Sequence, residues 1–182
     1  MRRPPRRRNA ASIRTESPVG TVRSARATLV KHLLIVHHSQ TGATAALAAA
    51  VIAGAREAAA ESLEVRTLDC LAATPDDVKW AHGVLLGTPE NFGYMSGALK
   101  YFFDRIYYPC LEHTQGLPYA LFVKAGNDGS GACASVERIV TGLRWRAVQA
   151  PLVAVGELTE AHLAAARELG ETVAAGVDLG LY

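Results

Sequence analysis

The chain has 182 residues, of which 49% are hydrophobic, so it is long enough to bury the core of one domain. Its formal charge of +2 is unevenly distributed: residues 1–30 carry eight arginines and one acidic residue, whereas residues 31–182 carry 11 basic and 16 acidic ones. The net charge of −5 on the larger part argues against a nucleic-acid-binding domain, because such domains present a basic surface.

Residues 1–30 form a predicted basic tail. They contain Pro, Ser and Arg but few large apolar side chains, so burial cannot offset their ordering entropy and we expect disorder. An Arg-rich, acid-poor segment can be a nucleic-acid arm, a contact for anionic lipid or an organelle transit segment. The composition favours the simpler alternatives, which are a solvated extension or a start codon placed too early. Residues 31–182 are the predicted folded domain.

Several classes of site are not expected. The three cysteines, Cys70, Cys110 and Cys133, are odd in number and widely spaced, which excludes a complete disulfide framework and a CxxC pair. His37 and His38 are the one adjacent histidine pair, and no two histidines have the i, i+4 spacing of helical metal ligands, so no metal site is expected. No apolar stretch reaches membrane-spanning length or resembles a secretory signal, so we expect a cytoplasmic protein.

From Leu33 onward, short apolar runs alternate with segments rich in helix formers. "LLIVH" at 33–37 is a continuous apolar run, as expected of a strand covered on both faces, whereas "LEVRTLD" alternates and is typical of an edge strand. Strands are predicted at 33–37, 63–69, 83–89, 119–126 and 150–157. Helices are predicted at 43–60, from Pro75 for a short stretch, and at 97–108, 133–144 and 159–176.

This alternation predicts an α/β domain with a parallel sheet, right-handed crossovers and helices on both faces. Ligands in such domains bind outside the carboxyl ends of the strands, where the strand order reverses. The segments to search are therefore the loops at 38–44, 88–97 and 125–132, which are polar and rich in glycine.

The first loop, "SQTGAT", lies between a predicted strand and a predicted helix. The N-terminus of a helix offers unpaired N–H groups and a partial positive charge, and Ser39, Thr41 and Thr44 add hydroxyl groups around Gly42. An ordinary helix cap with a Ser/Thr-rich turn is the alternative. The loop has no Lys and no G-x-x-x-x-G-K-[ST] pattern, which favours a single terminal phosphate over a nucleoside triphosphate.

"SQTGAT" resembles the phosphate loop of the flavodoxin-like superfamily, whose usual form is Ser/Thr-x-Thr-Gly-x-Thr. "GTPENFGYMSGALKYFFDRI" at 87–106 is similar to the flavin-ring loop of the NAD(P)H-dependent FMN reductase and quinone reductase branch, where Gly-Thr-Pro follows the third strand. The resemblance covers residues 31–182. It implies a three-layer flavodoxin-like fold, with a five-stranded parallel sheet in the order 2-1-3-4-5, and FMN as cofactor.

The candidate cofactor-binding residues fall in three groups. The phosphate group comprises Ser39, Gln40, Thr41, Gly42, Ala43 and Thr44. The first ring group comprises Pro89, Glu90, Asn91, Phe92 and Gly93, and the second comprises Asn127, Gly129 and Ser130. Phe92 or Tyr94 could pack on a flat ligand or be ordinary aromatics, and Glu90 could simply be solvated.

The third loop also matches the G-x-G-x-x-A dinucleotide fingerprint at Gly129, Gly131 and Ala134. That fingerprint needs an acidic residue about 20 positions further on to hold a ribose. Residues 145–156 contain none, so we interpret the loop as the third wall of an FMN site.

Two function classes follow from this resemblance. Electron-carrying flavodoxins usually cover the flavin with an aromatic residue of the third loop and present a strongly acidic rim, whereas 125–134 contain no aromatic residue here. An open ring face favours an oxidoreductase that takes hydride from NAD(P)H and passes it through FMN to a quinone or another small-molecule acceptor. A flavodoxin-type carrier is the alternative, and a flavin-free binding protein is a third. No side chain is assigned as a catalytic acid or base, and a homodimer or homotetramer is compatible with the family.

Overall fold

The structure is a computed structural model that describes residues 30–59 and 61–182. The predicted basic tail lies outside the described residues except for Val30. Within the described part, no helix combines the length and the apolar composition needed to cross a membrane.

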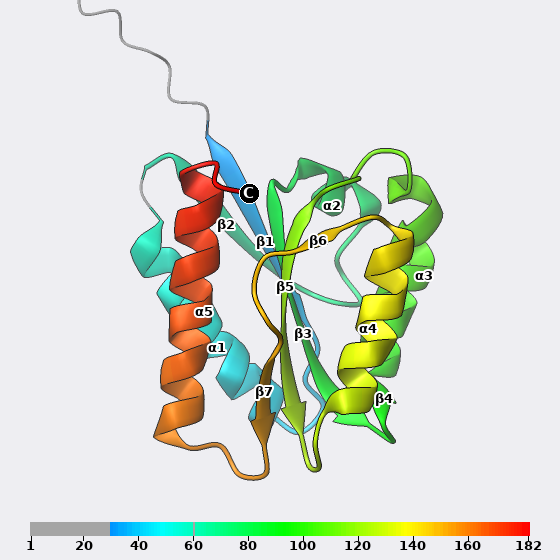
Figure 1. Cartoon of the computed structure of the whole chain (residues 1–182), viewed down its shortest axis with the longest axis vertical. Helices are drawn as coiled ribbons and strands as arrows, with labels where there is room; N and C mark the ends of the chain where they lie inside the picture. Colours follow the sequence, from blue (N-terminus) through cyan, green and yellow to red (C-terminus); the bar gives the residue numbers. More distant parts are fainter. Residues whose placement is uncertain (1–29, 60) are drawn as a thin grey trace, which may run out of the picture.

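One twisted sheet forms the centre of the domain (Figure 1). Its strands are β1 (Lys31–His37), β2 (Leu63–Asp69), β3 (Gly83–Asn91), β4 (Tyr94–Met95), β5 (Pro118–Ala125), β6 (Arg146–Ala147) and β7 (Leu152–Val155). The order is β2-β1-β3-β5, with β6 paired to the start of β5 and β7 paired to its end, all in parallel. The predicted strand order 2-1-3-4-5 and the predicted edge position of 63–69 are confirmed.

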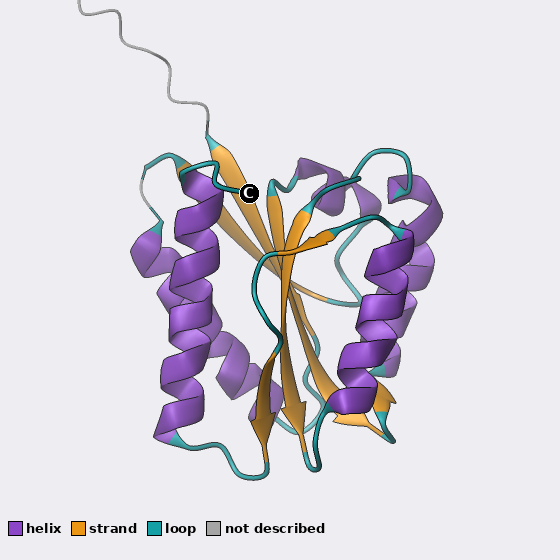
Figure 2. Ribbon diagram, in the orientation of Figure 1, coloured by secondary structure: helices purple, strands orange, loops and turns teal. Residues whose placement is uncertain are grey.

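Five helices cover the two faces of the sheet (Figures 1 and 2). They are α1 (Ala43–Ala58), α2 (Pro75–Trp80), α3 (Gly97–Cys110), α4 (Ser130–Gly142) and α5 (Glu160–Asp178). Alternate side chains of β1 point to opposite faces: Leu33 and Ile35 pack in a core with α1 and α5, and Leu34 and Val36 pack in a core with the other three helices. The predicted three-layer flavodoxin-like architecture is therefore confirmed.

The carboxyl ends of the parallel strands lie at the lower edge of the molecule in Figure 1. Four of the five helices, α1, α3, α4 and α5, begin at this carboxyl edge, whereas the short α2 lies at the opposite edge, near the last turn of α3 (Figure 1). The last turns of α1 and α5 lie at the opposite edge, next to the start of β1.

Of the boundaries that differ from the sequence prediction at this edge, two bear on the candidate site. The strand predicted to end at Pro89 continues to Asn91 and turns back as β4, pairing Glu90 with Met95 and Asn91 with Tyr94. The helix predicted at 133–144 begins instead at Ser130. The hairpin of β3 and β4 is local, but it packs against α4, which is far from it in the sequence.

Candidate functional site

The three loops singled out from the sequence lie together at the carboxyl edge. They follow β1, β3 and β5, which are neighbours in the sheet. The order of the sheet reverses between β1 and β3, and this switch point is where ligands bind in open α/β sheets.

The loop after β1 leaves an open position at the start of α1. Gly42 has a φ of 96°, in the left-handed region, and its N–H donates to the Ser39 hydroxyl at 3.2 Å. A Cβ at Gly42 would have no protein atom within 4 Å. Gln40 and Thr41 are exposed, whereas Thr44 is buried in the first turn of the helix.

The N-terminus of α1 differs from those of the other four described helices. The hydroxyls of Thr74, Ser96 and Thr159 cap α2, α3 and α5, respectively. The carboxylate of Glu90 accepts hydrogen bonds from the first N–H groups of α4. At α1, the N-cap residue Gly42 supplies no side chain. The first N–H groups of α1 are therefore the uncapped set at this edge, and they fit a phosphate.

The loop after β3 is a tight hairpin rather than an irregular loop. Phe92 and Gly93 have φ values of 54° and 68°, as a two-residue hairpin turn of the I′ type requires. The hydroxyl of the buried Thr88 accepts from the Ser96 N–H at 2.9 Å and thereby joins the two ends of the hairpin. The hairpin holds the Phe92 side chain fully exposed at its tip, so this aromatic is not part of the core.

Glu90 does not point into solvent, which corrects the alternative that it is simply solvated. Its carboxylate accepts from the N–H groups of Gly129 at 3.2 Å, Gly131 at 3.1 Å and Ala132 at 3.2 Å. The N–H and hydroxyl of Ser130 donate to Asp128 instead, at 2.9 and 2.7 Å. The second ring group is thus brought beside the first, while two of its N–H groups already have partners within the protein. Its contacts with a flavin ring stay a prediction.

Two histidines at the end of β1 border the phosphate loop, although no sequence pattern singled them out as site residues. The Nδ1 atoms of His37 and His38 are buried and have no hydrogen-bond partner in the structure. Burial lowers the pKa of His37, more than the nearby Asp69 carboxylate raises it. The available signal was their position, because they directly precede Ser39.

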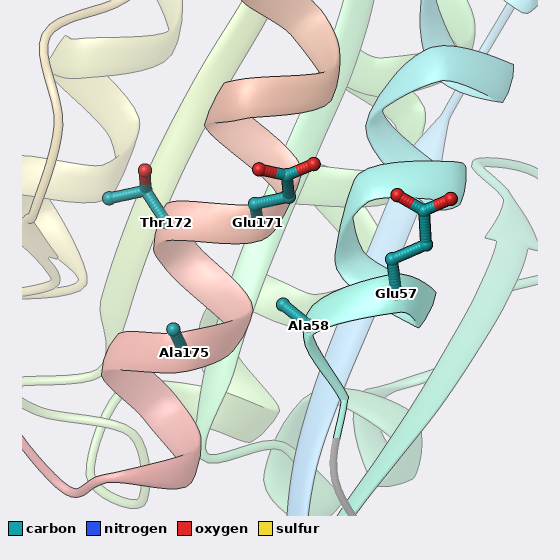
Figure 3. Close-up of a pocket in the computed structure, with 5 residues that line it drawn as sticks. All are labelled: Glu57, Ala58, Glu171, Thr172 and Ala175. Atoms are coloured by element: carbon teal, nitrogen blue, oxygen red, sulfur yellow. The ribbon is translucent and has the colours of Figure 1, made fainter.

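A cavity of about 500 Å³ lies elsewhere, between α1 and α5 (Figure 3). Its lining includes Glu57 from the last turn of α1 and Glu171 from the second half of α5, with Ala58, Thr172 and Ala175. These residues lie toward the amino edge of the sheet, and two carboxylates disfavour a phosphate there. Within the described chain, no group of three His, Cys, Asp or Glu residues could hold a metal ion.

Comparison with known proteins gives a curated sequence relative and solved structures with a similar fold. A flavodoxin of Aquifex aeolicus is 35% identical over 107 residues, which cover 57% of this chain and 57% of that protein. The chain therefore matches little more than half the length of this curated relative.

Solved structures share the fold. A flavodoxin from an archaeon superposes with a TM-score of 0.70 at 20% identity, over 80% of this chain and 98% of that one. A WrbA-like flavodoxin of Agrobacterium tumefaciens has a TM-score of 0.67 at 20% identity, over 82% and 98%. An NADH:FMN oxidoreductase in its apo form has a TM-score of 0.67 at 14% identity, over 81% and 90%.

A family model gives the assignment. The model of NADPH-dependent FMN reductases matches residues 32–160, which include all three loops and well over half of the chain. The predicted flavin cofactor, FMN, is confirmed by this match, and NAD(P)H as donor agrees with the name of the family. The chain belongs to the NADPH-dependent FMN reductase family.

Proposed function

We propose that this chain is an FMN-dependent oxidoreductase that accepts hydride from NAD(P)H and passes it to a quinone or another small-molecule acceptor. The observation that carries the proposal is the start of α1, where the helix lacks a capping side chain and the space beside Gly42 is empty. Those N–H groups, with the hydroxyls of Ser39 and Thr41, would bind the FMN phosphate without a lysine.

The ring of the cofactor would lie against the second and third loops. Pro89 to Gly93 and Asn127 to Ser130 would supply contacts to its edge, and Phe92 would offer a flat apolar surface beside it. FMN, when bound, supplies the centre that accepts a hydride and gives it up again. The chain's task is to orient that centre and to leave one face of it accessible to nicotinamide. The absence of any aromatic side chain in 125–134 supports an open face.

A flavodoxin-type electron carrier is the second candidate. It is favoured by the 35% identity to a flavodoxin and by the flavodoxins among the solved structures with this fold. A carrier has no substrate of its own, and a separate reductase would supply its electrons. The two candidates share FMN and differ in whether NAD(P)H reduces the bound flavin directly.

Anaerobic mixing separates the candidates. The purified protein, loaded with FMN, is mixed with NADPH and in parallel with NADH, and the flavin absorption band is followed. We expect rapid bleaching with at least one of the two nucleotides, and reoxidation when a quinone is added. An unchanged oxidised spectrum with both nucleotides would support the carrier instead.

The quaternary structure belongs to the same proposal. Phe92, Tyr94 and Tyr101 are exposed aromatic residues on the hairpin and on α3, the helix that follows it. They support a homodimer or homotetramer in which a neighbouring subunit lies over the flavin edge. Sedimentation analysis of the FMN-loaded protein tests this, and a monomer at every concentration would contradict it.

A further inference from the structure

The strongest unassigned feature is Glu90, whose carboxylate lies at the N-terminus of α4. It accepts from three N–H groups that follow it by 39, 41 and 42 residues in the chain. One oxygen takes the Gly129 N–H, and the other takes those of Gly131 and Ala132. The N-cap of α4 is Gly129, which has no capping side chain, so Glu90 takes the place of a cap from another element.

The hairpin and α4 touch at two further places. A Cβ at Gly131 would overlap the carbonyl oxygen of Gly93, so the first turn of α4 lies directly against the turn of the hairpin. Deeper in, the Met95 N–H donates to the hydroxyl of the buried Ser135 at 3.1 Å. Together with Glu90, these contacts join the β3–β4 hairpin and the start of α4 into one unit.

The chemistry of the contact requires a carboxylate. A negative charge is stabilised at the positive end of a helix, and two oxygens are needed for three donors. Glutamine has the same shape but only one acceptor oxygen, and its NH₂ group would face a backbone N–H. The contact thus depends on charge and not only on packing.

We infer that Glu90 is a positioning residue, an internal anion that occupies the N-terminus of α4 and locks the two ring-binding loops together. It leaves α1 as the uncapped helix for the phosphate of the cofactor. It also explains why the G-x-G-x-x-A pattern at 129–134 does not provide a dinucleotide site: the N–H groups that would bind a pyrophosphate already bind Glu90. The statement about ring-binding loops rests on the proposed function, whereas the occupancy of α4 does not.

The first test needs no flavin. Amide hydrogen exchange is measured residue by residue on the apo protein for the wild type, Glu90→Gln, Glu90→Ala and the control Glu157→Gln. Glu157 is an exposed glutamate in the loop between β7 and α5, at the same edge. We expect the amides of Gly129, Gly131 and Ala132 to exchange at least about tenfold faster in both Glu90 variants, because charge-assisted bonds are lost. The control should match the wild type.

Inorganic phosphate then tests the internal anion directly. In Glu90→Ala the start of α4 is uncapped, so millimolar phosphate should slow the exchange of these three amides again, which it should not do in the wild type. A structural residue without this role would not be replaced by phosphate. Unchanged exchange in both Glu90 variants, or lost protection that phosphate does not restore, would overturn the inference.

Measurements of flavin binding distinguish this inference from the proposed function. Glu90→Gln should weaken the binding of FMN and of riboflavin by the same factor, about tenfold. The reason is that Glu90 positions the loops proposed to hold the ring, which both flavins share, and not the loop proposed to hold the phosphate. A loss confined to FMN would contradict the assignment to the ring-binding loops. If the wild type bound neither flavin, the proposed function would fail, and the exchange experiment would still decide the occupancy of α4.

Discussion

Small residues serve opposite purposes in two regions of this molecule. Where α1 and α5 cross, a Cβ at Gly54 would overlap the carbonyl of Arg167, and a Cβ at Gly170 would overlap the carbonyl of Val51. The backbone of each helix thus occupies the space that a side chain at the other helix's glycine would need. At Gly42, in the phosphate loop, no protein atom occupies the space of the missing side chain. A glycine-rich stretch therefore marks a candidate site only where the rest of the fold leaves the space empty.

The largest effect is expected on stability at Gly170, where backbone atoms fill the space of the missing side chain. Gly170→Ala should lower the free energy of unfolding by roughly 3 kcal/mol, the upper end for overpacking, because backbone cannot move aside as a flexible side chain can. FMN affinity of the folded fraction should not change. Urea unfolding measures the stability.

Gly97→Ala is the matched control for that substitution. Gly97 begins α3, and a Cβ there would have no atom within 4 Å. Alanine should be neutral or stabilising by up to about 1 kcal/mol at such a position. Equal destabilisation by the two substitutions would show that close approach is not what distinguishes Gly170.

The next largest effect is expected on FMN affinity at Gly42, where no protein atom fills the space of the missing side chain. Gly42→Val should raise the dissociation constant for FMN about 30-fold, or about 2 kcal/mol, because the added side chain intrudes where the phosphate would lie. Riboflavin has no phosphate, so its weaker binding should change much less. Titration of the apo protein by flavin fluorescence measures both constants.

Gly156→Val controls for backbone strain in that experiment. Gly156 has a φ of 71°, lies in the loop before α5 at the same edge, and also has no atom within 4 Å of a Cβ. It should lose stability as Gly42→Val does while keeping its affinity for FMN. Equal affinity of the wild type for FMN and riboflavin would remove the argument for a phosphate site.

A smaller effect is expected at the third loop. Ser130→Trp adds an aromatic side chain beside the predicted ring face and should slow flavin reduction by NAD(P)H about tenfold, since nicotinamide must stack there. FMN should stay bound. Stopped-flow measurements record the rate. The control is Ser130→Ala, which removes the hydroxyl bonded to Asp128 without adding an aromatic cover, so it separates the loss of that hydrogen bond from the covering of the ring. An equal rate for Ser130→Trp and the wild type would argue against an open face.

The smallest effect concerns His82, which directly precedes β3. Burial lowers its pKa from 6.5, and the neighbouring His32 and Lys31 lower it further. Since the unfolded chain binds the proton more readily, the free energy of unfolding should fall as pH decreases through 6.5 toward the lowered pKa. Protonation would also break the bond from the His32 N–H to His82 Nδ1. His82→Gln should flatten this pH dependence in thermal unfolding, and an unchanged slope would contradict it.

Much of the fold was predictable from local patterns. Windows of a few residues contain the signals for three elements. These signals are the apolar run of β1 that ends at His37, the alternation in β2, and the threonine and proline at the start of α2. The phosphate loop was predictable for the same reason, because its glycine and hydroxyl residues are consecutive and act on the helix that follows them directly.

The sequence by itself determined the order of strands and helices, and with it the edge at which the candidate site lies, because parallel crossovers allow few arrangements. The caps of α2, α3 and α5 are local, whereas only the tertiary structure decided what occupies the start of α4. Glu90 reaches amides 39 to 42 residues away, at the N-terminus of α4. The close crossing of α1 and α5 was decided in the same way. Such contacts join segments that are distant in sequence, and their free energy depends on which groups the folded chain brings within hydrogen-bonding distance.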